Sequence, residues 1–297
     1  MSTPKWKPWS AAPRWARRAQ LIAVWVAVVL AWEGAYRVVG WRPWIFPAPS
    51  HVLDATLGML NVRTGFGEPL HGAWPGPPGA PGAGSRSIVG SPLVVALGVS
   101  GARLAVGFGA SMILGLVVGI GLWRSAFLNS LLGPLFLGLQ TLPSVCWVPL
   151  AVLILGINER GILFVLVMGS AFSMAIAMRD GLRSLPPIYR AAGRMMGARG
   201  WRLYVHVLLP ASLPALVGML RQGFSFAWRS LLGAELILMT QRRGVGFLLS
   251  AGREFADVAQ VVAVMGVMVA VGMVVDRWVF AVVEQRVRTR FGLVAAR

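Results

Sequence analysis

The chain has few residues of the kinds that perform covalent chemistry. Its only lysines are Lys5 and Lys7, so it contains no phosphate-binding loop of the G-x-x-x-x-G-K-[ST] type. The three histidines, His51, His71 and His206, are scattered and have no metal-ligand spacing. A G-x-S-x-G motif is absent, and no two carboxylates lie close together within an apolar segment. We therefore expect no catalytic residue, cofactor or metal site, and any uphill work would need energy from another chain.

Acidic residues and cysteine are also scarce. The chain has 10 aspartates and glutamates against 28 lysines and arginines, giving a net charge of +18. Such a balance can indicate nucleic-acid binding, but much of the arginine flanks apolar runs and no nucleic-acid-binding motif is present. Nucleic acid is therefore not an expected partner. Cys146 is the single cysteine, so it forms no intrachain disulfide, and its apolar surroundings predict an inert, packed thiol.

Apolar residues are abundant instead. They make up 57% of the chain, only 13% of residues are charged, and the mean hydropathy is +0.70. Soluble domains have roughly a quarter charged residues, and a membrane helix needs about 20 apolar residues. We predict an all-α bundle in contact with membrane lipid, with about six transmembrane helices: 20–40, 93–123, 126–156, 161–178, 208–239 and 258–283.

The basic residues predict an orientation. Most of the 28 lysines and arginines precede the first segment, lie between the fourth and fifth, or follow the sixth. The positive-inside rule then places both termini in the cytoplasm of a multi-pass inner-membrane protein. The predicted parts are a basic cytoplasmic leader (1–19), a first membrane helix too long for a signal peptide (20–40), an external loop (41–92) with a Pro/Gly-rich insertion (67–87), a membrane core (93–285) with a cytoplasmic segment (179–208), and a basic cytoplasmic tail (286–297).

Two features of the spans suggest a pathway rather than an anchor. Gly107, Ser111, Gly115 and Gly119 recur every four residues, which favours close helix packing, or a sliding surface between the halves of a gate. Prolines interrupt two spans, and broken helices at membrane depth need protein or water to satisfy the freed backbone groups. These prolines are Pro134, Pro143 and Pro149 in the third span and Pro210 and Pro214 in the fifth.

Polar residues inside the spans are the candidate pathway residues. Each intramembrane charge costs on the order of 3 kcal/mol on insertion scales, so it should pair internally or face water. Two interpretations remain open: Arg229 and Glu235 satisfy each other or lie near the interface, or the cations line a path for an anion. The candidates are Arg103, Arg221, Trp228, Arg229 and Glu235.

The segment 190–210, "RAAGRMMGARGWRLYVHVLLP", is predicted to form a cytoplasmic helix–turn–helix. Pro186 and Pro187 precede a helix over 188–196, and Gly197 permits a sharp turn. A second helix follows, with an apolar side formed by Trp201, Leu203, Tyr204 and Val207 that can lie on the membrane. Pro210 ends this element. The paired alanines and the arginines face outward, where a soluble partner can dock.

Gly197, followed thirteen residues later by Pro210 and preceded by two alanines, resembles the coupling ("EAA") motif of ABC-importer permeases. Other stretches resemble the nitrate/sulfonate/taurine branch of that family in order and spacing. They are "WIFPAPSHVL" (44–53), "GARLAVGF" (101–108), "LPSVCWVPLAVLILGI" (142–157), "GLRSLPPIYRAA" (181–192), "LLPASLPALVGMLRQGFSFAW" (208–228), "GAEL" (233–236) and "GVGFLL" (244–249). The resemblance runs from about residue 44 to the C-terminus, without the 67–87 insertion.

This resemblance implies a type I (MetI-like) importer permease without enzymatic activity. Its implied partners are cytosolic ABC ATPases, a second permease copy and an extracytoplasmic solute-binding protein, and its implied solute is small and anionic. By this resemblance, the residues expected to couple the permease to the ATPase are Arg190, Ala191, Ala192, Gly193, Arg194, Gly197, Ala198 and Pro210. A secondary transporter or channel working without an ATPase is the alternative, and a membrane enzyme comes third.

One departure from the family pattern concerns the glutamate that usually opens the motif. Depending on the count, Arg190 or Ala191 occupies that position. The loop then docks without this ion pair, or it uses Arg190 and Arg194 toward acidic groups of the ATPase.

Overall fold

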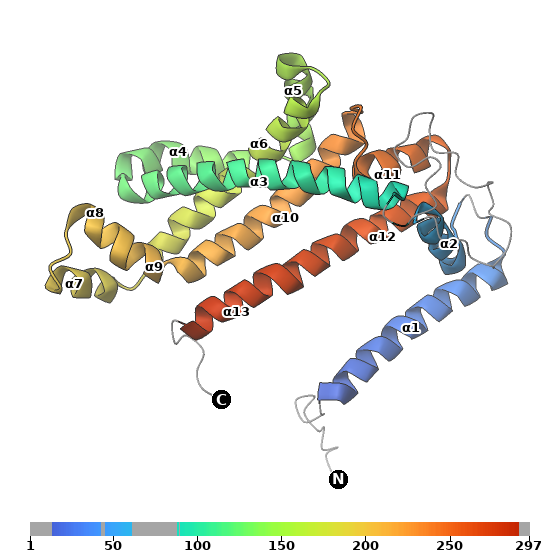
Figure 1. Cartoon of the computed structure of the whole chain (residues 1–297), viewed down its shortest axis with the longest axis horizontal. Helices are drawn as coiled ribbons and strands as arrows, with labels where there is room; N and C mark the ends of the chain where they lie inside the picture. The colour runs from blue at the N-terminus through green and yellow to red at the C-terminus, as the bar shows by residue number, and fades with distance from the viewer. Residues whose placement is uncertain (1–13, 43–44, 61–87, 89, 291–297) are drawn as a thin grey trace, which may run out of the picture.

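The computed structural model describes residues 14–42, 45–60, 88 and 90–290, and throughout these ranges the regular elements are helices (Figure 1). Most of the predicted leader, the 67–87 insertion and the end of the tail lie outside the described residues. The first helix, α1 (Arg14–Val39), begins within the predicted leader and covers the first predicted span.

The centre of the molecule consists of three long helices packed together. They are α3 (Pro92–Arg124), α6 (Glu159–Arg183) and α10 (Leu213–Ile237). The predicted small-residue stripe of α3 is buried against α6: an added Cβ at Gly115 would lie 2.5 Å from the Met174 Cβ, and one at Gly119 would meet Met178. The stripe therefore brings two helices close together, as close packing requires.

The third predicted span is not one straight helix. It comprises α4 (Ala126–Leu139), the short turn η2 (Ser144–Cys146) and α5 (Trp147–Leu155), and the two apolar halves meet at 99°. Pro143 directly precedes η2, and its missing N–H favours a break there. Figure 1 shows α5 projecting away from the other helices. The predicted packing of Cys146 is wrong for this chain, because its side chain is exposed at the break.

The remaining segments complete the two ends of the bundle. The predicted external loop contains α2 (Pro49–Met59), and α11 (Val245–Glu254) follows α10. The sixth predicted span is continuous through α12 (Val258–Val274), the π-helical turn η4 (Val275–Phe280) and α13 (Ala281–Arg290).

By length and apolar composition, four helices in the described ranges are able to cross a membrane, or five if the bent pair counts as one span. They are α1, α3, α6 and the α12–α13 helix. The remaining predicted span, α10, is 25 residues long and has ten buried residues. It is not among these four helices because its charged and polar side chains make it less apolar. The prediction of about six spans thus corresponds to six helical segments, of which one is bent and one is less apolar.

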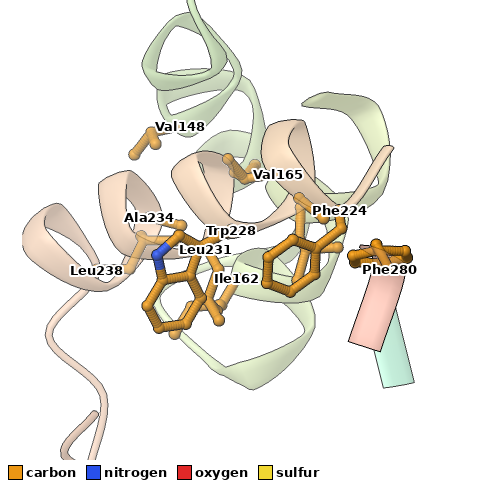
Figure 2. Close-up of a cluster of buried hydrophobic side chains, with 12 residues drawn as sticks. Val148, Ile162, Val165, Phe224, Trp228, Leu231, Ala234, Leu238 and Phe280 are labelled. Atoms are coloured by element: carbon orange, nitrogen blue, oxygen red, sulfur yellow. The ribbon is translucent and has the colours of Figure 1, made fainter. Parts of the chain in front are cut away.

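The hydrophobic core lies around α10. Figure 2 shows Phe224, Trp228 and Leu231 on one side of this helix, close to Ile162 and Val165 of α6. Val148 of α5 and Phe280 of η4 extend the same cluster. Because lipid tails are as apolar as these side chains, close van der Waals packing rather than removal from water stabilises the cluster, and this packing fixes one face of α10.

Candidate functional site

The predicted coupling segment folds as two short helical pieces joined by a glycine turn. Its first helix, α7, spans Pro187–Met195, close to the predicted 188–196, and begins at a proline as expected. Gly197 has φ +81°, its N–H donates to the Arg194 carbonyl at 3.0 Å, and the Ala198 N–H donates to the Gly193 carbonyl at 2.9 Å. These two bonds form a Schellman motif, in which the left-handed residue is nearly always glycine.

Gly193 sets the distance between α7 and the segment after the turn. That segment consists of α8 (Gly200–Leu203), the π-helical turn η3 (Tyr204–Leu208) and α9 (Leu209–Ala211). An added Cβ on Gly193 would lie 2.5 Å from a methyl carbon of Leu203 and 3.2 Å from those of Val207. The apolar side of the second piece therefore packs on α7, at least through Leu203 and Val207, rather than being wholly available to a membrane.

The outer surface of α7 is exposed, and most of its side chains are small or apolar. Ala191 and Ala192 are exposed as predicted, as is Arg194. Met195 and Met196 are 87% and 79% exposed, and Ile188 is exposed as well. We name the surface formed by Ile188, Ala191, Ala192, Met195 and Met196 the α7 surface. An exposed apolar patch of this kind is typical of a protein–protein contact.

Arg190, one of the two positions where the family motif has glutamate, does not point wholly outward. Its guanidinium lies 5.0 Å from the ring centroid of Trp123, near the end of α3. Such a cation–π contact ties α7 to the core and contributes about 0.5–1 kcal/mol at an exposed site.

Pro210 does not end the coupling element, as its position had suggested. It lies inside α9, and α10 starts three residues later at Leu213, five residues after the predicted start of the fifth span. The π-helical turn η3 precedes this point, so the entry into α10 is irregular for several residues.

Arg103 is buried and holds two carboxylates. Its Nη1 lies 2.6 Å from Glu235 Oε1, and its Nε and Nη2 donate to the two carboxylate oxygens of Glu159 at 2.8 and 2.6 Å. Nη2 also donates to the Thr240 hydroxyl and to the Arg242 carbonyl. This cluster joins α3, the start of α6, the end of α10 and the loop after α10. With all these partners, the Arg103 guanidinium holds the four segments together and is not available to bind a solute.

Glu235 is enclosed from the other side by α3 and α11. Its carboxylate accepts from the Ser100 hydroxyl at 2.7 and 2.9 Å and from the Gly246 N–H at 3.1 Å. An added Cβ at Gly244 or Gly246 would collide with the Glu235 side chain. The motifs "GARL", "GAEL" and "GVG" therefore meet at one buried ion pair, and the two glycines of "GVG" leave room for the Glu235 side chain.

Arg221 is also paired. Its guanidinium binds Asp276 of η4 through two hydrogen bonds of 2.5 and 2.7 Å, and it lies 3.2 Å from Glu284 of α13. Two carboxylates thus surround one cation, and the three side chains are only partly exposed. This arrangement ties α10 to the C-terminal helix.

Trp228 and Arg229 are adjacent in the chain but point to different sides of α10. Trp228 is 8% exposed, and its indole N–H donates to the Met268 carbonyl at 3.2 Å, which assigns it to the core. Arg229 is exposed, donates to the Ser225 carbonyl at 3.0 Å and lies over the Phe226 ring. The interpretation that Arg229 pairs with Glu235 is wrong, because Glu235 is paired with Arg103.

The sequence did not reveal which residues pair with these candidates and so distinguish the structural charges from the exposed one. Glu159, Asp276 and Glu284 are the carboxylates that compensate Arg103 and Arg221, and Trp123 is the partner of Arg190. Each lies at least 55 residues away along the chain. The only local signal was that each carboxylate lies at or near the end of an apolar run.

Residues 111–289 match the family described as "binding-protein-dependent transport system inner membrane component". This match spans more than half of the chain and includes the coupling segment, α10 and the C-terminal helix. The chain belongs to this family. We refer to it below as the permease, a multi-pass component of the inner membrane.

Curated relatives include permease proteins of several transport systems. The permease is 27% identical over 177 residues to the nitrate import permease protein NrtB of Synechocystis sp., a stretch covering 60% of this chain and 64% of the relative. It is 29% identical over 177 residues to the bicarbonate transport system permease protein CmpB of Synechococcus elongatus, covering 60% and 63%. It is 26% identical over 194 residues to the taurine transport system permease protein TauC of Escherichia coli, covering 65% and 70%. The first two matches thus span less than two thirds of the relatives' length.

A solved structure supports the fold. The permease resembles a chain of the MetNI methionine ABC transporter in inward-facing conformations, with a TM-score of 0.56 and 20% identity. The likeness covers 66% of the permease and 95% of that chain. The expected type I, MetI-like fold is therefore confirmed.

Proposed function

We propose that the permease is the membrane subunit of an ATP-driven importer and that the α7 surface binds a cytosolic ABC ATPase. The observation that carries this proposal is the α7 surface itself, which is exposed and consists of alanine, isoleucine and methionine side chains. A Schellman motif fixes the end of this helix, and the chain is a member of this family. Adaptable methionine side chains suit a contact that must persist while the partner changes shape.

The mechanism proposed is alternating access. ATP binding draws the two ATPases together and displaces α7, which moves with α8–α9 because Gly193 packs against Leu203. The movement reaches α10 through α9, and α3 through the Arg190–Trp123 contact. A packed bundle responds to such a displacement by switching between discrete arrangements rather than by bending continuously.

The further partners are a second copy of the permease and an extracytoplasmic solute-binding protein. The exposed apolar side chains of α5, including Leu153 at 84% and Ile154 at 63%, support contact with a second copy or with lipid. The relatives named for nitrate, bicarbonate and taurine import support a small solute carrying a negative charge.

Co-purification of the permease with the products of its neighbouring genes, assayed for an ABC ATPase, tests the coupling role. Met195→Asp and Met196→Asp place a charge on the α7 surface without touching the core, so we expect each to reduce the recovered ATPase at least tenfold. Gly197→Pro, which is incompatible with φ +81° and removes the N–H bonded to Arg194, should have the same effect.

Phe255→Asp is the matched control, because Phe255 is 70% exposed but lies after α11 at the opposite end of the bundle. It should leave ATPase recovery unchanged. Unchanged recovery in all three α7 variants, together with transport that needs no ATP, would favour the alternative of a secondary transporter or channel.

A further inference from the structure

Helix α10 has one polar stripe that no other described element covers. Figure 2 shows another side of this helix, where Phe224, Trp228 and Leu231 enter the core. Four exposed residues of α10 are spaced by four, three and four positions, which places them on a single helical face. We name this face the polar stripe; its residues are Gly218, Gln222, Ser225 and Arg229.

Arg229 contributes an uncompensated positive charge to the polar stripe. Of the three arginines among the candidate pathway residues, Arg103 and Arg221 each bind two carboxylates. Arg229 has no carboxylate within salt-bridge distance in the part of the chain that the structure describes. Its interactions there are a backbone carbonyl and the face of an aromatic ring.

The position of this charge limits what lies against it. Arg229 is the seventeenth residue of a 25-residue helix, well inside the predicted span. Facing lipid would cost on the order of 3 kcal/mol, whereas water or a polar ligand would avoid that cost. At the other end of the stripe, an added Cβ on Gly218 would meet nothing within 4 Å.

The chemistry of the stripe suits an oxyanion. The planar guanidinium binds carboxylates, sulfonates and similar groups through paired N–H donors, and Gln222 adds amide donors two helical turns away. A second guanidinium nearby, Arg221, is neutralised by Asp276 and Glu284. Among the candidate pathway arginines, Arg229 is therefore the one whose charge no described carboxylate neutralises.

We propose that Arg229, assisted by Gln222, is a binding site for a small oxyanion on a water-filled face of α10. This inference rests on the proposed transport function and assigns the charge selectivity of the pathway to one residue. The competing occupant is a carboxylate of a second permease copy, which would make Arg229 a subunit contact.

Charge-selective thiol modification tests the proposal without knowledge of the solute. Ser225 lies one helical turn before Arg229 on the same stripe, so Ser225→Cys is introduced into a Cys146→Ala background. Membrane vesicles containing the full transporter are treated with an anionic sulfonate-bearing and a cationic ammonium-bearing methanethiosulfonate reagent. We expect the anionic reagent to react faster.

Arg229→Gln should lower the anionic-to-cationic rate ratio about tenfold at low salt, because the charge attracts one reagent and repels the other. Arg229→Lys should retain most of the ratio. Higher salt should reduce it, as screening requires. Arg253→Gln removes a charge at the end of α11 and is the control for a general change in surface potential, so it should leave the ratio unchanged.

Three results would overturn the inference. A Ser225→Cys thiol that reacts with neither reagent would show that the stripe faces lipid or is packed. A rate ratio unaffected by Arg229→Gln would remove the role of this charge. Loss of the permease dimer in Arg229→Gln would identify a subunit contact instead. None of these readouts depends on ATPase binding, so their failure is distinguishable from failure of the α7 variants.

Discussion

At the residue scale, the charged side chains have different functions although they look alike in the sequence. Arg103, Arg221 and Arg229 all interrupt apolar segments. Arg103 and Arg221 bind carboxylates and tie helices together, while Arg229 is exposed without one among the described residues. From the sequence, all three charges are expected to be costly to place in the membrane. This free-energy cost alone does not reveal which residue compensates each charge.

The Arg103–Glu235 pair makes a prediction about stability. Glu235 has a 1% exposed side chain and, within the described ranges, an ion pair with Arg103 alone, whereas Arg103 retains Glu159 if Glu235 is removed. Arg103→Met should therefore cost about 3–5 kcal/mol, and Glu235→Met less. Thermal unfolding of the permease in detergent measures both.

The control is the exposed pair of Arg37 and Glu33 in α1, where the Arg37 side chain is 75% exposed. Arg37→Met should change stability by no more than about 1 kcal/mol. If Arg103→Met is as mild as Arg37→Met, the buried cluster does not hold the four segments together.

At the element scale, close packing determines which glycines are required. In α3, Gly115 lies against Met174 and the backbone of Ala175, while Gly109 has open space on the same helix. The four-residue spacing predicted the stripe to which Gly115 belongs. It did not identify α6 as the partner, because the spacing describes one face and says nothing about what covers it.

A pair of substitutions in α3 tests this difference. Gly115→Ala forces α3 and α6 apart and should cost about 1–3 kcal/mol. Gly109→Ala should be neutral or stabilising by up to about 1 kcal/mol, because alanine favours helix interiors. Denaturation midpoints of the two variants give the comparison, and equal destabilisation would contradict close packing at the stripe.

The bent pair α4–α5 shows a limit of composition at this scale. Residues 126–156 are apolar enough for one span, and three prolines indicated interruptions. The 99° bend and the projecting α5 depend on how the segment packs beside α6, which hydropathy does not report.

At the scale of the whole molecule, the segments predicted to be cytoplasmic gather at one end. In Figure 1 the α3–α4 turn and α7–α8 lie at the left, the end of α13 lies at the lower left and the start of α1 lies at the bottom, while α2 and α11 lie toward the right. The positive-inside rule predicts that the first group is cytoplasmic.

Single-cysteine labelling measures this orientation. In a Cys146→Ala background, Met195→Cys and Thr289→Cys should react with an impermeant maleimide only after the cells are permeabilised. Ile88→Cys, which is 58% exposed and lies in the predicted external loop, should react in intact cells. Labelling of Met195→Cys from outside would remove the ATPase-docking role of α7.

The sequence by itself determined the helical membrane class, most span positions and the helix and glycine turn at 187–197, and its motifs indicated the family. The class, the spans and the turn follow from hydropathy, charge and turn chemistry, which act between residues close together in the chain. Only the tertiary structure decided that Arg103 and Glu235, 132 residues apart, are partners, that Arg190 lies on Trp123, and that Arg229 is on the exposed face of α10. The physical reason is that the partner of a buried charge is set by helix packing, and helix packing depends on contacts between segments distant in the chain.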